Sequence, residues 1–255
     1  MLGIFRSGLE WFGELALFAD GLVKALLRPH FEWREFLRQC DQIGARALPL
    51  VALAGAATGV VISLQTRDSL VRFGAKSFLP ALVVFSMIKE SGPVITGLVV
   101  CGRAGAQIGA ELGSMKVTEQ IDAMEASAVD PIGYLALTRV LSCTLMLPLL
   151  TLATDFSGIV MGWLANNLSD HISLRLFIER GFKEAQFSDF IPPVTKTAVF
   201  GLIIGLIATF QGMRTRGGTE GVGRTATSSV VISSLFVIVA DVVLVRMILM
   251  IWPAT

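Results

Sequence analysis

Residues 140–165 read VLSCTLMLPLLTLATDFSGIVMGWLA, and Asp155 is the one charged residue among them. An α-helix rises about 1.5 Å per residue, so about 20 apolar residues cross a hydrocarbon core about 30 Å thick. Apolar runs of this length with so few charges are not typical of a soluble domain. We therefore interpret this stretch as a membrane span.

Four further windows meet the same length, at residues 47–66, 78–101, 192–213 and 228–252. Five spans of this kind satisfy their backbone hydrogen bonds within each helix, as the interior of a bilayer requires. We predict an all-α integral membrane protein in which residues 47–255 form one domain of five transmembrane helices.

The composition of the 255 residues agrees, because 53% of them are hydrophobic, 16% are charged and the mean hydropathy is +0.70. The net charge of +1 gives no basic excess for binding nucleic acid. Cys40, Cys101 and Cys143 have no CxxC spacing, and His30 and His171 are far apart, so no zinc or other metal site is expected. These features exclude a typical cytosolic enzyme, a disordered chain and a disulfide scaffold.

Residues 1–46 precede the first span and lack the features of a signal peptide. Their apolar residues recur every three or four positions, with charged residues between them, at Trp11, Leu15, Phe18, Leu22 and Leu26. This spacing predicts an amphipathic helix. It could pack in the cytosol or lie in the membrane interface, and we favour the interface because Trp and Phe share the apolar face.

Lys and Arg are distributed unequally between the two sides of the predicted spans. Twelve lie in residues 1–46, 102–139 and 214–227, against six on the opposite side, with Lys196 and Arg246 near span ends left unassigned. The side richer in Lys and Arg is cytoplasmic by the positive-inside rule. The N-terminus is then cytoplasmic, and five spans place the C-terminus outside.

Two segments between spans differ in character. Residues 102–139 contain five acidic residues and the apolar Met115, Ile121 and Met124, which indicates a short helix that either binds a partner or folds back on the bilayer. We favour a partner, because anionic headgroups repel acidic side chains. Residues 217–223 are rich in glycine but contain no Walker A motif, so we interpret them as a tight turn rather than a nucleotide site.

Charged residues inside the spans are candidates for function, because they are costly there. Lys89-Glu90-Ser91-Gly92-Pro93 interrupts the second span and predicts a helix break at the midplane. Glu90 either lines a cavity or pairs with a buried group such as Arg246. Asp155 and Asp241 are expected to form hydrogen bonds to neighbouring helices. No GxSxG motif occurs, so we expect no catalytic residue.

Several of these segments resemble the MlaE/YrbE permeases, the membrane subunits of the Mla and Mce lipid ABC transporters. The first loop contains GRAG at 102–105, ELGSMKVTEQIDA at 111–123 and AVDP at 128–131. The second contains GG at 217–218 and GVG at 221–223, leading to SSVV at 228–231 and to Asp241. KESGPV at 89–94 resembles the family's basic-Glu-x-Gly-Pro segment. The resemblance covers the chain from about residue 5 to its end.

The resemblance implies a homodimeric permease with no cofactor of its own. ATP and Mg would be bound by a cytoplasmic, MlaF-like ABC ATPase. A hexameric ring of MlaD-like Mce-domain proteins would bind outside, and often an MlaB-like STAS-domain protein would bind the ATPase. The implied location is a bacterial inner membrane facing a periplasm, in the pathway that maintains outer membrane lipid asymmetry.

The resemblance also assigns residues to two sites. A cytoplasmic coupling helix between spans two and three, which docks on the ATPase, would include or adjoin Glu111, Met115, Thr118, Glu119, Gln120 and Asp122. A lipid cavity shared by both protomers would be lined by Ile62, Leu70, Phe73 and Glu90. For a phospholipid-like substrate we expect Glu90 or Lys89 to lie near the headgroup. Phe73 occupies a position where a known member has tyrosine.

The expected function is therefore a permease subunit that moves phospholipid-like lipids between the inner membrane and a periplasmic Mce ring. Two alternatives remain open at this point. One is a proton-coupled secondary transporter that uses Glu90 as its carrier, and the other is a membrane scaffold that transports nothing.

Overall fold

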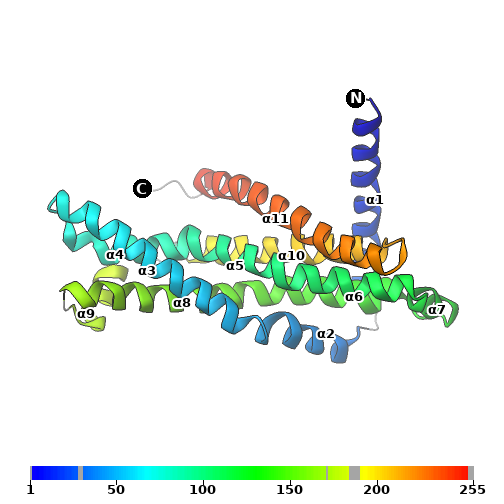
Figure 1. Cartoon of the computed structure of the whole chain (residues 1–255), viewed down its shortest axis with the longest axis horizontal. Coiled ribbons are helices and arrows are strands. Elements are labelled where there is room, and N and C mark those ends of the chain that lie inside the picture. The colour runs from blue at the N-terminus through cyan, green and yellow to red at the C-terminus, as the bar shows by residue number, and fades with distance from the viewer. Residues whose placement is uncertain (1, 28–30, 171, 184–189, 252–255) are drawn as a thin grey trace.

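The computed structural model of the chain describes residues 2–27, 31–170, 172–183 and 190–251, and throughout this part the regular elements are helical. Five helical stretches are long and apolar enough to cross a membrane, which confirms the predicted all-α, multi-pass class. Figure 1 shows them running along the long axis of the molecule. His30, His171 and Trp252 lie outside the described residues.

Each span contains one or more helical segments. The first span comprises α2 (Trp33–Cys40), η1 (Asp41–Ala45) and α3 (Leu48–Arg72). The second span comprises six segments in order: η2 (Lys76–Phe78), α4 (Leu79–Ser86), η3 (Met87–Ser91), α5 (Gly92–Val100), η4 (Cys101–Gly105) and α6 (Ala106–Val117). The third comprises η5 (Ile132–Leu137) and α8 (Thr138–Asp170), the fourth is α10 (Ile191–Met213), and the fifth is α11 (Gly218–Ile251). The five predicted windows fall within these stretches as far as they are described.

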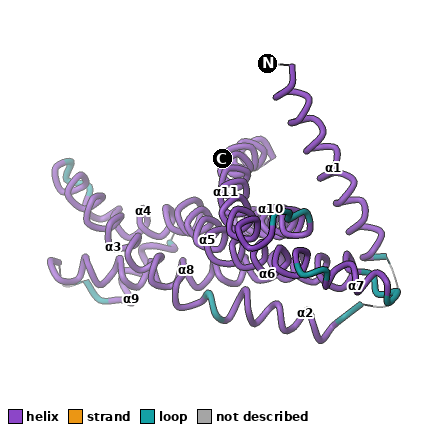
Figure 2. The backbone as a smooth tube through the Cα atoms, turned by 45° about the vertical axis from the view of Figure 1, so that its right-hand side comes forward, coloured by secondary structure: helices purple, strands orange, loops and turns teal. Residues whose placement is uncertain are grey.

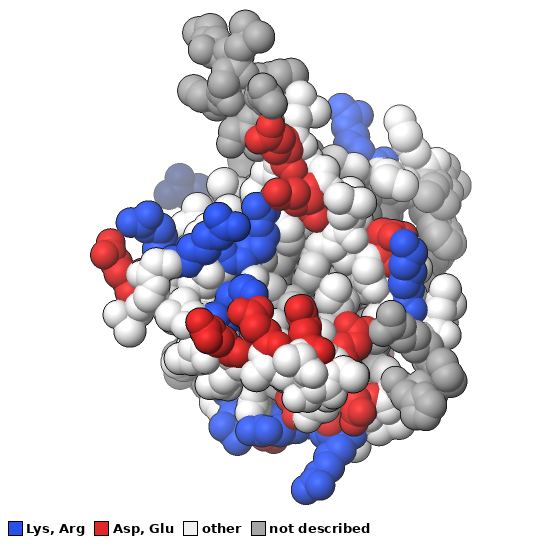
Figure 3. All heavy atoms as spheres, turned by 90° about the vertical axis from the view of Figure 1, so that its right-hand side faces the viewer, with Lys and Arg blue, Asp and Glu red and all other residues white. Residues whose placement is uncertain are grey.

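The connections lie at the two ends of the bundle. The turn around η2 and the short helix α9 (Leu174–Phe182) lie at one end, and α7 (Gln120–Ala126) and the α10–α11 turn lie at the other (Figure 1). Segments that the charge distribution predicts on opposite sides of the membrane are thus at opposite ends. Figure 3 looks onto the α7 end, where Asp and Glu side chains gather near the middle with Lys and Arg side chains around them.

The helix α1 (Leu2–Leu26) crosses the direction of the spans at the α7 end (Figures 1 and 2). Leu22 and Ala25 are buried in a cluster with residues at the start of the third span, and the Trp11 ring lies edge-on to Phe210 at 5.6 Å. Leu17 on the same helix is exposed. The predicted helix is confirmed, and its crosswise direction suits a position in the membrane interface, which stays a prediction.

Glycines allow α3 and α8 to pack with their backbones in contact, over a longer stretch than any other pair of helices. A Cβ atom on Gly59 would lie 1.9 Å from the carbonyl oxygen of Gly158, and one on Gly55 would lie 2.4 Å from that of Thr154. Small residues have this role in membrane helices, where association depends on close packing and not on the exclusion of water.

We expect Gly59→Ala to lower the free energy of unfolding by about 1–3 kcal/mol, because the added methyl group must separate α3 from α8. The measurement is thermal unfolding of the purified protein in detergent, followed by circular dichroism. Gly102→Ala is the matched control, since a Cβ atom at that helical position meets nothing within 4 Å. Equal melting temperatures for the two variants would contradict this packing.

Candidate functional site

The second span changes its helical geometry where the sequence carries Lys89 to Pro93. The helix continues through this segment with a π-helical turn, η3, and Pro93 occupies the first turn of α5. The predicted break at the midplane is therefore wrong. Proline lacks an N–H, and a local π-turn accommodates that loss without interrupting the span.

Pro93 leaves the carbonyl group of Lys89, four residues earlier, without its usual helical donor. The ammonium group of Lys196, on α10, takes that place and donates to the Lys89 carbonyl oxygen at 3.1 Å. The same Nζ atom lies 2.9 Å from Oε2 of Glu90 and 2.9 Å from Oδ1 of Asp241 on α11. One side chain therefore connects the second, fourth and fifth spans.

The three contacts of Lys196 follow from the burial of its ammonium group. The Lys196 side chain is 1% exposed, whereas the Glu90 side chain is 50% exposed. A buried ammonium group is tolerated when it is paired and hydrogen-bonded, as Lys196 is here. Glu90 thus uses one side of its carboxylate for Lys196 and keeps part of its surface open.

The pairing differs from the alternatives that the sequence suggested. Glu90 pairs with Lys196 and not with Arg246, which is exposed on α11. Asp241 does contact a neighbouring helix, through an ion pair. Sequence reasoning missed Lys196 because it lies five residues into its span, where a lysine can also reach the membrane surface. The sequence did contain an indication of its role, because Glu90 and Asp241 are carboxylates inside other spans and each needs a cation there.

Asp155 departs from expectation in another way. Its Oδ1 atom is buried and has no hydrogen-bond partner within the described residues, although a hydrogen bond to a neighbouring helix was predicted. The side chain lies against the Cα atom of Gly92, directly after the π-turn.

The residues assigned to a lipid cavity lie in three places on one protomer. Ile62 and Leu70 pack against a buried cluster that includes Leu79 and Phe177. Phe73, just after α3, is 84% exposed. Lys89 and Glu90 belong to the π-turn, with Nζ of Lys89 5.0 Å from the centre of the Phe85 ring. The cavity itself stays a prediction, since the resemblance places it between two protomers.

The residues assigned to ATPase coupling surround the corner between α6 and α7. Glu119 and Gln120 are exposed there, and Glu119 adopts a left-handed backbone conformation with φ of 59°. Nζ of Lys116 lies 2.5 Å from Oδ1 of Asp122, and Gln120 donates to the hydroxyl oxygen of Thr118 at 3.0 Å. These contacts hold a compact corner at the charged end of the molecule. Met115 packs against the main core cluster.

Glu111 is set back from that corner. Its Oε2 atom lies 3.3 Å from Nη2 of Arg139, which is buried at the start of α8, and its Oε1 atom accepts a hydrogen bond from Gln107. Glu111 thus connects α6 to α8. This contact between helices distant in sequence has no signal in the local pattern.

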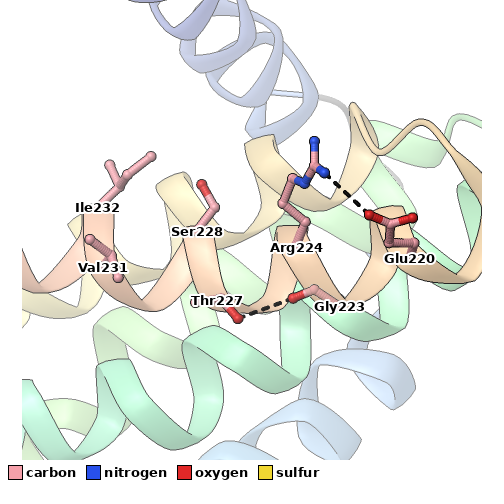
Figure 4. A pocket seen from close by; sticks show the side chains of 7 residues that line it. All are labelled: Glu220, Gly223, Arg224, Thr227, Ser228, Val231 and Ile232. Atoms are coloured by element: carbon pink, nitrogen blue, oxygen red, sulfur yellow. Dashed lines mark hydrogen bonds and ion pairs between the residues drawn. The ribbon is translucent and has the colours of Figure 1, made fainter.

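The predicted turn at residues 217–223 is wrong for most of that segment, because only Gly217 lies in the connection between α10 and α11 and residues 218–223 form the first turns of α11. Gly217 and Gly218 have φ values of 93° and 68°, which favour glycine. A depression of about 720 Å³ follows on the first turns of α11, where Nη2 of Arg224 lies 3.3 Å from Oε1 of Glu220 (Figure 4). Val231 and Ile232 add apolar side chains to its lining.

Comparison with known proteins covers most of the chain. The family described as Permease MlaE matches residues 36–247. A probable ABC transporter permease protein of Rickettsia conorii is 36% identical over 229 residues, which are 90% of this chain and 88% of the relative. A probable ABC transporter permease protein of Synechocystis is 32% identical over 91% of this chain and 89% of the relative. Protein TRIGALACTOSYLDIACYLGLYCEROL 1, chloroplastic, of Arabidopsis thaliana is 32% identical over 92% of this chain and 67% of the relative.

We expect Lys196→Met to destabilise the protein by about 3 kcal/mol, because Glu90 and Asp241 then lose their shared cation. Glu90→Gln should cost less, since Glu90 is half exposed. The measurement is chemical unfolding in detergent, with Lys24→Met as the control for loss of an exposed ion pair. Equal effects of Lys196→Met and Lys24→Met would show that the buried ammonium group does not hold the spans together.

Proposed function

The chain belongs to the MlaE permease family, and from this premise we propose that it is the permease subunit of an ABC transporter that moves phospholipid-like lipids between the inner membrane and a periplasmic ring of Mce-domain proteins. It is a multi-pass membrane permease subunit, by family and by its five spans. The match over residues 36–247 carries this proposal more than any single residue does.

An ATPase partner is supported by three observations. Relatives are named ABC transporter permeases, and the sequence contains no Walker A motif with which this chain could bind ATP itself. The α6–α7 corner exposes Glu119 and Gln120 at the end that the charge count predicts to be cytoplasmic. We propose that a cytoplasmic, MlaF-like ATPase docks on this corner and binds the ATP and Mg, with an MlaB-like STAS-domain protein as a possible further subunit.

A lipid substrate is supported by the chemistry of the exposed groups. Acyl chains require apolar contacts and a headgroup requires a few polar partners. Phe73 offers exposed apolar surface after α3, and Glu90 and Lys89 offer charge at the π-turn. The name of the plant relative is that of a galactolipid, which is consistent with a lipid as the transported class.

The path from corner to cavity follows the second span. The helices from η3 through α6 form one continuous stretch, so displacement of the α6–α7 corner moves the π-turn that carries Glu90. Closure of the ATPase dimer would displace the corner in each protomer of a homodimer. The shared cavity would then narrow and release lipid to, or accept it from, a hexameric MlaD-like ring.

We expect Glu119→Lys to weaken association with the ATPase by about tenfold, because reversing the charge of an exposed group at the docking surface opposes complementary charges. The measurement is the amount of ATPase that co-purifies with the permease. Glu220→Lys is the control, as another exposed acidic residue, in the first turn of α11. Normal co-purification of the Glu119 variant would argue against this docking site.

We expect Leu70→Arg and Phe73→Arg to abolish crosslinking of a photoreactive phospholipid inside the dimer, because a guanidinium group in the proposed apolar cavity is a poor partner for acyl chains. Ser69→Arg, at the exposed position beside Leu70, should leave crosslinking intact. Unchanged crosslinking in all three variants would remove the cavity assignment. Lipid transport driven by a pH gradient in liposomes without ATPase would instead support a proton-coupled transporter.

A further inference from the structure

Asp155 is the most isolated acidic side chain inside the described spans. It lies in the middle of α8, is 8% exposed, and its Oδ1 atom has no hydrogen-bond partner within the described residues. An ionised carboxylate in that position would carry an uncompensated charge within the bilayer. The proposed function makes no use of this residue.

The Asp155 side chain occupies the space beside the π-turn. A Cβ atom on Gly92 would lie 1.7 Å from Oδ1 of Asp155 and 2.9 Å from the carbonyl oxygen of Met87. The carboxyl group and a main-chain carbonyl of the π-turn are thus on the same side of Gly92. Glycine at this position leaves the room that the carboxyl group fills.

The cations of the neighbouring spans are engaged elsewhere. Lys196, on α10, pairs with Glu90 and Asp241, and Lys89 lies over the ring of Phe85. Neither lies within ion-pair distance of Asp155 among the contacts of the described residues. The other charged residues of the packed α3, Arg67, Asp68 and Arg72, are at its far end.

We propose that Asp155 is carried in the membrane as a neutral carboxylic acid whose O–H group donates to a main-chain carbonyl of the π-turn. The Met87 carbonyl oxygen lies on that side of Gly92 and accepts one hydrogen bond from the Gly92 N–H group, and its second lone pair can accept another. Asp155 is then a positioning residue: it holds the turn from the α8 side while Lys196 holds it from the α10 side, and together they set where Glu90 lies.

Infrared spectroscopy of the purified chain in nanodiscs tests the protonation state without ATPase or lipid transport, so its outcome is independent of the proposed function. At neutral pH we expect the carbonyl band of a protonated carboxylic acid, shifted in D2O and absent from Asp155→Asn. Glu90→Gln and Asp241→Asn should retain the band. A spectrum unchanged by Asp155→Asn, or a band lost in Glu90→Gln instead, would overturn the proposal.

The positioning role has its own test, in a variant with Cys40, Cys101 and Cys143 replaced and a single cysteine introduced by Ser91→Cys on the π-turn. Asp155→Asn keeps a donor of the same shape and should leave the rate of maleimide labelling unchanged, whereas Asp155→Val should alter it several-fold. Equal labelling in all three proteins would show that Asp155 does not hold the turn.

Discussion

The ammonium group of Lys196 is the contact on which the arrangement of three spans depends. It donates to the carbonyl group that Pro93 leaves without a helical partner, and it pairs with one carboxylate from the second span and one from the fifth. In water these groups would be solvated separately, and the spans would gain little from bringing them together. In the bilayer they must satisfy one another, and doing so fixes how α5, α10 and α11 are rotated about their own axes.

This constraint joins two regions that the sequence separates. Glu90 lies within the helical stretch Lys76–Val117, which ends at the α6–α7 corner, so the charged turn and the corner belong to the same span. The ion pair between Glu111 and Arg139 ties that span to α8 close to the corner. The corner is therefore connected to the π-turn through the backbone of the second span and to the third span through the buried guanidinium group of Arg139.

The sequence predicts those parts of the fold that depend on residues close together in the chain. Apolar windows locate all five spans and the three- to four-residue spacing locates α1, whereas the turn predicted at residues 217–223 falls mostly within the first turns of α11. The contacts at the site could not be predicted in this way, because Glu90 and Lys196 are over a hundred residues apart and their pairing depends on helix rotation. A π-turn and a break have the same proline and glycine signature, which is why the second span was wrongly expected to be interrupted. Glu90 and the partner-binding character of residues 102–139 were indicated by the charge pattern, whereas the other lipid and coupling residues came from the family resemblance.

The close packing of α3 against α8 at their glycines limits which parts of the molecule can move. Helices that touch through their backbones, as at Gly59 and Gly158, cannot slide past each other without a clash, so they travel as one rigid body. Bending of the bundle is then easier outside this pair, and the π-turn of the second span is a local irregularity at which a helix can bend. The chain thus combines a rigid pair of helices, α3 and α8, with a less regular second span packed beside them.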